Sequence, residues 1–435
     1  MSKDTIVIGG GLAGLTAANL LARAGNKVTV FEKSQMIGGR AITTTKNGIL
    51  FNLGPHALYR SGKAYKITRE LGLEISGHVP KVGGTLAIKE GHRHKLPGGA
   101  MSLLTTSLFG LSAKLEVARL LTTLPKIDTS QFNSLTVREW LDSEIHNPDV
   151  RQLVQAFFRL GTYANDPARQ SAGLALAQFQ MALKESVLYL DGGWQTLVNG
   201  LRAKAEQASV KIINESRVAK IMRDHTGRVT GVVLPDGSQH RADAVVIAAS
   251  PQEACDLVEG GQQTALGEWA NNAIPVKAAC LDVALERLPE PQTTFALGID
   301  RPLYLSVHSA AAKLAPEGNA VIHVAMYLGA ENTADPKATE HELEALLDLV
   351  QPGWRRLVLE RRFMPSLTVV NALATAEQGG LAGRPGPAVP DIEGLFVVGD
   401  WVGPEGWLAD ASLASGKHVA ELVIQMPNKT MAKAA

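Results

Sequence analysis

The first forty residues combine short apolar runs with one helical stretch. Asp4 to Ile8 is an apolar run that predicts a buried strand, and Leu12 to Ala24 is helical up to the Gly25-Asn26 stop. Lys27 to Glu32, rich in Val and Thr, predicts a second strand. A strand, a helix and a strand in this order predict a βαβ unit with parallel strands.

The middle of the chain changes to a mostly helical pattern, between residues 98 and 190. A hairpin over Thr85 to Leu96, turning at Glu90-Gly91, precedes it. Thr136 and Glu139 form a capping box that predicts a helix start. Further helices are expected from Pro148 to Leu160 and from about Ser171 to Val187.

After Gly192-Gly193 the strand and helix patterns alternate again. We expect a helix from Trp194 to Ala208, and the final helix from Ala411 to about Ile424. Strands are expected near Val210, Val218 and Val229, at Ala244 to Ala248, within 275 to 330 and at Leu395 to Val398. Alternating α/β material at both ends and in the middle predicts two interleaved domains rather than two successive ones.

Size and composition are those of a soluble globular protein. A chain of 435 residues with 45% hydrophobic and 20% charged residues has room for two or three units. The net charge of +1 and the lack of a basic block give nucleic acid no electrostatic support. Cys255 and Cys280 stand far apart, which argues against a disulfide framework, a thiol pair or a zinc site and fits a reducing cytoplasm.

Two uncharged segments resemble membrane signals. Thr5 to Ala22 holds four glycines and follows Asp4, so it is a poor signal peptide. Leu96 to Ala113 is interrupted by Ser and Thr residues, which makes a spanning helix improbable. A helix that contacts lipid at the interface is one interpretation of this second segment, and a buried or channel-lining helix is the other. We therefore expect a cytoplasmic protein for which peripheral membrane contact stays open.

A dinucleotide fingerprint lies between the first strand and the first helix. Gly9 allows a tight turn, Gly11 lets the backbone approach a pyrophosphate, and Gly14 lets the helix pack against the sheet. The helix N-terminus would then face the anion. Glu32 ends the second strand, where a carboxylate can accept hydrogen bonds from ribose hydroxyls. This carboxylate disfavours NADP and leaves NAD and FAD open.

A second and remote motif favours FAD. Gly39 and Arg40 follow the second strand, and the guanidinium offers a planar donor set for phosphate oxygens. Near the other end, a buried strand ends in Gly399-Asp400 and is followed by Trp407-Leu408-Ala409 and a helix. A carboxylate there can bind a ribityl hydroxyl, and the helix N-terminus can stabilise negative charge on a reduced flavin. NAD enzymes have no need of this second contact.

These motifs resemble the flavin-containing amine oxidoreductase superfamily, which includes amine oxidases, protoporphyrinogen oxidase and phytoene desaturase. The resemblance rests on VIGGGLAGLTAA with FEK, IGGRA, FNLGPHA, the predicted strand at Arg217-Val218 and LFVVGDWVGPEGWLADASLASG. The C-terminal motif looks closest to the phytoene desaturase branch. Asn52 departs from the acidic residue that many relatives have.

The resemblance implies one FAD and a set of residues that contact it. Gly9, Gly10, Gly11, Leu12, Ala13, Gly14, Glu32, Lys33, Gly39 and Arg40 would hold the ADP half, and the backbone of Val218 would contact adenine. Gly54, Pro55, His56 and Ala57 would run beside the ring or the ribityl chain. Gly399, Asp400, Trp407, Leu408 and Ala409 would hold the ribityl and pyrimidine end.

The expected fold class is α/β, with a Rossmann-like FAD-binding domain interleaved with a mixed α+β substrate domain. Residues 1–75, 190–265 and 380–435 are assigned to the FAD-binding domain. Residues 76–189 and 266–379 are assigned to the substrate domain, with a mostly helical insertion at 98–189.

No second strand-GxGxxG-helix is present, so the hydride is expected to come from a small organic substrate, apolar or amine-bearing, and to pass to flavin N5. Tyr59 and Trp401 are candidate substrate contacts. His56 is either an acid or base or, as we favour, a hydrogen-bonded scaffold residue. Phe157, Phe158 and Tyr163 either line an apolar tunnel or belong to the core. No catalytic residue and no metal ligand is assigned, and the oligomeric state stays open.

The amine oxidases of the superfamily carry a lysine near flavin N5. In this chain we align that position with the apolar region near Val283, and Lys277 lies several residues away. This favours chemistry other than that of monoamine oxidases. Two alternatives stay open: a flavin-dependent isomerase or desaturase of carotenoid type, and a prenyl-lipid escort protein without catalysis. The survival of Glu32, Arg40 and Asp400 argues against the escort protein.

Overall fold

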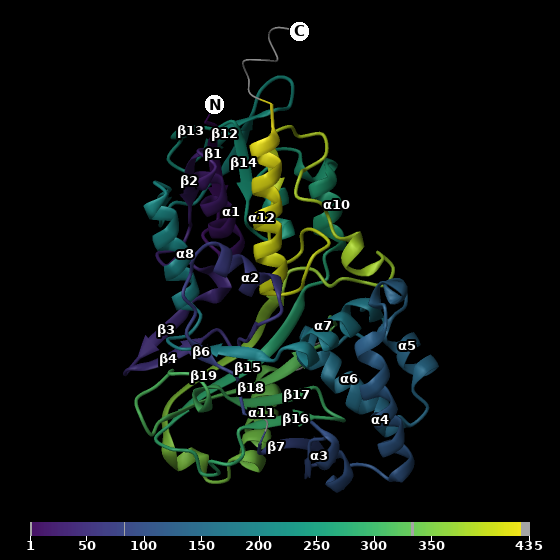
Figure 1. The fold of residues 1–435 in the computed structure, drawn as a ribbon. Coiled ribbons are helices and arrows are strands. Elements are labelled where there is room, and N and C mark those ends of the chain that lie inside the picture. The colour runs from purple at the N-terminus through teal and green to yellow at the C-terminus, as the bar shows by residue number, and fades with distance from the viewer. Residues whose placement is uncertain (1, 82, 332–334, 428–435) are drawn as a thin grey trace.

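A computed structural model describes residues 2–81, 83–331 and 335–427. Residues 1, 82, 332–334 and 428–435, which the predicted domain segments include, lie outside the described residues. Two large sheets organise the molecule (Figure 1). One contains the nucleotide fingerprint, and the other forms a wall of the central cavity.

The first sheet is parallel and five-stranded. Its order is β10 (Lys211–Ile213), β2 (Lys27–Phe31), β1 (Asp4–Ile8), β14 (Ala244–Ile247) and β20 (Leu395–Val397). These strands lie within the three segments that the sequence assigned to the cofactor domain, and the exact boundaries stay a prediction.

Both faces of the parallel sheet are covered, because successive side chains of a strand point to opposite faces. On one face Val7 and Val246 pack against the helices α1 (Leu12–Arg23), α8 (Gln195–Gln207) and α12 (Ala409–Gln425). Figure 1 shows the yellow helix α12 beside the purple helix α1. The other face packs on β11 (Lys220–Arg223), β12 (Val229–Val233), β13 (Gln239–Arg241), α9 (Pro251–Asp256) and α10 (Ala265–Asn272).

The second sheet is seven-stranded and mostly antiparallel. Its order is β19 (Val358–Val370), β15 (Val276–Leu285), β18 (Ala320–Leu328), β17 (Leu303–Val307), β16 (Phe295–Gly298), β7 (Thr85–Lys89) and β8 (His92–Lys95), and only β16 and β7 pair in parallel. One face packs on α11 (Pro336–Val350). The other face lines the cavity through residues such as Cys280 and Tyr304.

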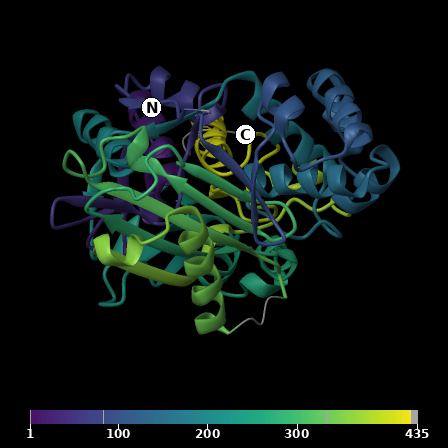
Figure 2. The ribbon, with the colours of Figure 1, turned by 90° about the horizontal axis from the view of Figure 1, so that it is seen from below.

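A helical cluster stands beside this sheet, in blue in Figures 1 and 2. It contains α3 (Ala100–Thr105), α4 (Leu111–Thr123), α5 (Val137–Glu144), α6 (Pro148–Thr162) and α7 (Ala172–Lys184). The capping box at Thr136 and Glu139 is confirmed at the start of α5. Short elements connect the parts: β3 (Thr43–Lys46), β4 (Ile49–Asn52), β5 (Leu58–Tyr59), α2 (Lys63–Glu70), β6 (Gly77–His78) and β9 (Val187–Leu190).

Three local predictions need correction. No strand forms at Arg217-Val218, since β11 begins at Lys220. The helix expected up to Val187 ends at Lys184, and the residues from Val187 to Leu190 pair as β9 with β5 and β6. The sequence also did not predict β19, which contains Pro365. That strand lies at the edge of its sheet, where a residue without an amide hydrogen is tolerated.

Among the described residues, none of the helices has the length and apolar character needed to cross a bilayer.

Candidate active site

One cavity of about 1260 Å³ runs from the glycine loop after β1 to the wall formed by the seven-stranded sheet, α6 and α7. It brings together residues that lie almost four hundred positions apart in the sequence. The lining contains most of the predicted site residues: Gly9, Gly11, Leu12, Ala13, Gly14, Glu32, Lys33, Gly39, Arg40, Pro55, His56, Ala57, Tyr59, Val218, Gly399, Asp400, Trp407, Leu408 and Ala409.

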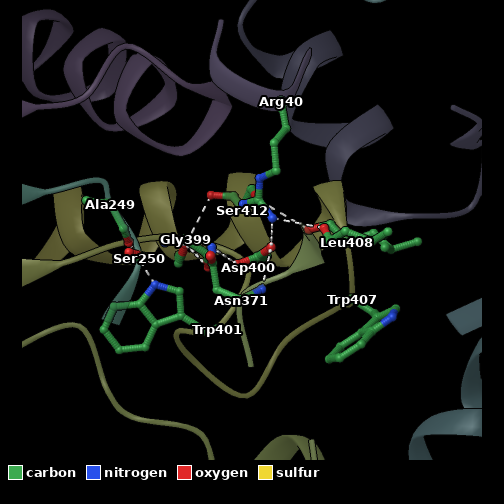
Figure 3. A network of polar contacts seen from close by, with 12 residues as sticks. Arg40, Ala249, Ser250, Asn371, Gly399, Asp400, Trp401, Trp407, Leu408 and Ser412 are labelled. Atoms are coloured by element: carbon green, nitrogen blue, oxygen red, sulfur yellow. Dashed lines mark hydrogen bonds and ion pairs between the residues drawn. The ribbon is translucent and has the colours of Figure 1, made fainter. Parts of the chain in front are cut away.

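Three predicted residues are not part of this lining. Gly10 lies behind it and donates its backbone N–H to Glu32. A Cβ at Gly54 would stand 2.9 Å from the sulfur of Cys280, so this glycine allows a close approach of loop and sheet. Trp401 is a core residue rather than a pocket residue, since its indole donates to the carbonyl of Ala249 and packs near Trp269 (Figure 3).

The glycine loop has the geometry of a phosphate cradle. Gly9 has a φ of +109°, and a Cβ there would lie 2.5 Å from the carbonyl oxygen of Ala248. A Cβ at Gly14 would lie 2.1 Å from the carbonyl oxygen of Gly9. A Cβ at Gly11, in contrast, would meet no protein atom within 4 Å and would project into the cavity. No side chain caps the start of α1, so its N–H groups stay available for an anion.

Glu32 is held in place by backbone donors. Its two carboxylate oxygens accept hydrogen bonds from the amides of Gly10 and Ser34, each at 2.8 Å. Carboxylate oxygens can accept further hydrogen bonds, so ribose hydroxyls fit beside these contacts. Lys33 lines the cavity too, but its ammonium forms an ion pair with Glu253 at 2.5 Å. The structure therefore gives Lys33 a partner within the protein.

Asp400 is the centre of a polar network at the end of β20 (Figure 3). It is buried, and Arg40 donates to its Oδ2 at 2.6 Å. Asn371 donates to Oδ1 through its side-chain amide at 2.9 Å, and Arg384 donates to the backbone carbonyl at 2.8 Å. The network ties the loop after β2 to β20, so the two predicted halves of the cofactor site meet here. Sequence reasoning missed Asn371 and Arg384, which stand in no motif.

His56 has the contacts of a scaffold residue. Its Nδ1 lies 3.1 Å from the carbonyl oxygen of Gly54, and its Nε2 lies 3.2 Å from that of Arg40. The ring packs 5.0 Å from the ring of Trp194. Burial lowers the pKa of the imidazole below its ordinary value, which favours the neutral ring. A neutral imidazole has one N–H and can donate to only one of the two carbonyls.

Asp410, at the start of α12, also lines the cavity, although the sequence pattern alone did not indicate it as a site residue. Its Oδ1 accepts a hydrogen bond from the amide of Ala64 at 2.7 Å. Burial raises the pKa of this carboxyl to about 6. The signal in the sequence was its place directly after Trp407-Leu408-Ala409.

The far end of the cavity is apolar, and we call it the substrate lobe. It is formed by the lining residues within 80–98, 157–189 and 278–311, among them Phe157, Leu160, Phe179, Leu183 and Phe295. These described residues include no carboxylate and one charged side chain, Lys81. Phe157 and Tyr163 line the lobe, whereas Phe158 belongs to the helical core.

No lysine of β15 reaches the cavity. Lys277 is exposed and is followed by Ala278, which lines the cavity, so the two side chains point to opposite faces. Val283 is buried in the core beneath α11. Tyr59 and Tyr163, which line the cavity, donate their hydroxyls to the carbonyls of Gly161 and Pro55.

Comparisons with known proteins agree with this geometry. The model of the flavin containing amine oxidoreductase family matches residues 12–424. A 4,4'-diaponeurosporene oxygenase of Staphylococcus aureus is 26% identical over 283 residues, which cover 57% of this chain and 55% of the relative. The chain thus spans about half the length of the curated relatives it matches.

Solved structures share the fold. An oxidoreductase of Methanosarcina mazei has a TM-score of 0.76 at 20% identity, over 96% of this chain and 100% of the other. Putrescine oxidase bound to putrescine has a TM-score of 0.75 at 15% identity, over 98% and 100% of the two chains. The α/β fold class is therefore confirmed.

The family match covers nearly the whole chain, and the glycine cradle, the carboxylate of Glu32 and the Arg40–Asp400 network have the form that FAD requires. The alternative of an escort protein without catalysis is set aside. The chain belongs to the flavin-containing amine oxidoreductase family and is an FAD-dependent oxidoreductase.

Proposed function

We propose that this oxidoreductase acts on an uncharged, largely apolar organic molecule that enters the substrate lobe. The observation that carries the proposal is the lining of that lobe, which is mostly aromatic and aliphatic, with neutral amides and hydroxyls and Lys81, and contains no carboxylate among its described residues. A protonated amine would lose its hydration there without gaining a counter-charge, which is unfavourable. Of the two substrate types that the sequence left open, the lobe favours the apolar one.

Different residues along the cavity would hold the parts of FAD and the substrate. Gly9, Gly11 and Gly14 with the start of α1 would hold the diphosphate of FAD, and Glu32 would hold the ribose. Asp400 would hold the ribityl end, and Arg40, which is paired with it, would contact the ADP half. The bound flavin supplies the hydride acceptor at N5. The apolar lobe excludes water and orients the substrate beside it.

The test is anaerobic reduction of the bound flavin. FAD-loaded protein is mixed with 4,4'-diaponeurosporene, the carotenoid in the name of the S. aureus relative, and separately with putrescine. We expect the visible flavin absorbance to bleach with the carotenoid and to persist with the diamine. Bleaching by putrescine alone would refute the apolar substrate class. A product of unchanged mass, with no acceptor consumed, would support the isomerase alternative.

An exposed apolar surface lies close to the lobe. Met101, Leu104, Leu111 and Leu115, on α3 and α4, are between 65% and 76% exposed. They follow Leu96 and Gly98, which line the cavity. We call these four residues the α3–α4 patch. Exposed apolar groups of this size are typical of a contact surface for lipid or protein.

We propose an anionic lipid bilayer as the partner of the α3–α4 patch. Lys95 and Lys114 reach toward it, with their ammonium groups on Thr105 and on the carbonyl of Leu104. Arg119 adds a third cation on α4, while Glu116 is engaged by the amides of His146 and Asn147. Cations around an apolar patch favour anionic lipid headgroups. An apolar substrate dissolved in the bilayer would then lie next to the lobe.

Sedimentation with vesicles tests this contact. We expect the protein to pellet with vesicles of phosphatidylglycerol and phosphatidylcholine more than with phosphatidylcholine alone. Equal recovery in the supernatant with both vesicle types would refute the lipid partner.

A further inference from the structure

Three hydroxyl groups lie together in the wall of the substrate lobe, which is mostly apolar and also contains Gln178, Gln292 and Thr294. The hydroxyl of Tyr189 lies 3.0 Å from Oγ of Ser306, and both residues line the cavity. Tyr304 stands two positions before Ser306 on β17, and its hydroxyl interacts with those of both Tyr189 and Ser306. We call Tyr189, Ser306 and Tyr304 the hydroxyl cluster. It differs from Tyr59 and Tyr163, whose hydroxyls are each committed to a backbone carbonyl.

A row of ionisable side chains, Arg362, Asp282 and His323, lies beside the hydroxyl cluster. Asp282 and His323 are fully buried, with His323 Nδ1 at 2.6 Å from Asp282 Oδ1. Arg362 donates to the other carboxylate oxygen at 2.6 Å. Pairing of the strands places Arg362 opposite Asp282, Asp282 opposite His323, and His323 opposite Ser306. Directly opposed residues share one face of a sheet, so the row and Ser306 lie on the same face.

A stack of rings links the row to Tyr189. The ring of His308 lies 3.8 Å from that of Tyr189 with an angle of 16° between them, and it meets the ring of His323 edge-on at 4.5 Å. Because Asp282 accepts the Nδ1 proton of His323, the orientation of that imidazole is fixed. Burying charged groups is costly unless they are paired, so each member of the row has little freedom to move. These packed and paired side chains therefore hold the hydroxyl cluster in a fixed position.

The hydroxyl cluster can form further hydrogen bonds to a ligand. Each hydroxyl can donate one hydrogen bond and accept two, so the contacts among the three hydroxyls use at most three of their six acceptor positions and leave the others for a ligand. Burial raises the pKa of Tyr189 and of Tyr304, so both keep their protons. Neutral hydroxyls in a mostly apolar wall match a neutral polar group better than an ion.

We propose that Tyr189, Ser306 and Tyr304 form a binding subsite for one uncharged oxygen, a hydroxyl or a carbonyl, on an otherwise apolar substrate. The proposal deepens the proposed function and rests on its apolar substrate class. The subsite fixes where the apolar chain lies in the lobe, since the oxygen can be satisfied at this position of the wall. It selects oxygen-bearing molecules over hydrocarbons of the same length.

The experiment measures binding rather than turnover. Radiolabelled dodecane, dodecan-1-ol and dodecylamine are dialysed to equilibrium against the FAD-loaded protein. We expect the alcohol to bind about tenfold more tightly than the alkane, the effect of one hydrogen bond in a buried site. The amine should bind more weakly than the alcohol. In the double variant Tyr189→Phe with Ser306→Ala, the ratio of alcohol to alkane binding should fall tenfold or more, because the buried alcohol loses its partners, with alkane binding unchanged.

Tyr65→Phe is the control, because it removes a tyrosine hydroxyl on α2, outside the lining of the cavity. It should keep the alcohol preference, and FAD content should be equal in all proteins. Equal binding of alcohol and alkane to the unmodified protein, or an unchanged ratio in the double variant, would overturn the subsite. Flavin reduction by an apolar substrate without any alcohol preference would refute the subsite and leave the proposed function intact. An alcohol preference in a protein whose flavin is not reduced by any apolar substrate would refute the proposed function and leave the subsite as a binding site.

Discussion

The two ends of the cavity are built in different ways. At the nucleotide end, the proposed contacts with FAD come from the backbone N–H groups of a local loop, with glycines where a side chain would collide or block the approach. At the substrate end, side chains converge from three distant segments, 80–98, 157–189 and 278–311. Recognition by backbone leaves a fixed glycine spacing in the sequence, whereas recognition by side chains leaves none. The comparison explains why the cofactor is readable from the sequence and the substrate is not.

The largest effect is expected from Gly11→Val. The new side chain would meet no protein atom near its Cβ but would occupy the space of the diphosphate, so the fold should persist while FAD affinity falls about a hundredfold or more. Gly110→Val is the matched control, because Gly110 also caps a helix with extended backbone and an open Cβ position. Flavin absorbance after gel filtration, with circular dichroism of both variants, measures the difference. Full FAD content in the Gly11→Val protein would refute recognition of the diphosphate by the backbone of this loop.

Asp400→Ala tests the point where the two halves of the cofactor site meet. It removes the buried acceptor of Arg40 and Asn371, and loss of charged hydrogen bonds should lower FAD affinity about tenfold or more. The control is Glu393→Ala, which breaks an ion pair with Arg228 in which the Glu393 side chain is exposed. The control should keep its FAD affinity in a fluorescence titration. An equal loss in both variants would show a general effect of charge rather than a site contact.

At Asp410 we expect a pH-dependent effect on stability rather than on FAD affinity. Its folded-state pKa of about 6 lies above the ordinary value of 3.8, so the folded protein favours the protonated carboxyl. Stability from this group is present at low pH and is lost as the pH rises from about 4 through 6, by roughly 3 kcal/mol in total. Asp410→Asn keeps the acceptor for Ala64 and should abolish this dependence. Thermal melts of the FAD-free proteins between pH 4 and 8 provide the measurement, and parallel curves would contradict the assignment.

The smallest effect on stability is expected at the α3–α4 patch. Leu111→Ser with Leu115→Ser changes two side chains that are 76% and 65% exposed, so the melting temperature should stay within about a degree. Vesicle binding should fall several-fold, because the apolar contact with lipid is lost. Leu359→Ser, at an exposed leucine on β19 away from the patch, is the control and should bind vesicles normally. Unchanged vesicle binding of the double variant would show that the substrate end has no lipid contact here.

The sequence by itself determined the βαβ opening, the phosphate cradle and the flavoprotein family. The spacing of the glycines is local, and Gly14 is required by the carbonyl oxygen of Gly9 five residues away, whereas Gly9 is required by Ala248, which follows the neighbouring strand β14. The capping box of α5 and the strand ending at Gly399-Asp400 are similar cases. In contrast, β19 was missed because its tolerance for Pro365 depends on its place at the sheet edge.

Only the tertiary structure decided which polar side chains share a cavity. Trp401 stands next to Asp400 in sequence, yet its indole turns into the core (Figure 3). Asn371, Arg384 and the row from Arg362 to Ser306 carry no motif, because they are brought together by strand pairing and loop packing over long distances. Such contacts depend on the register between strands, and a single sequence does not encode that register in any local spacing.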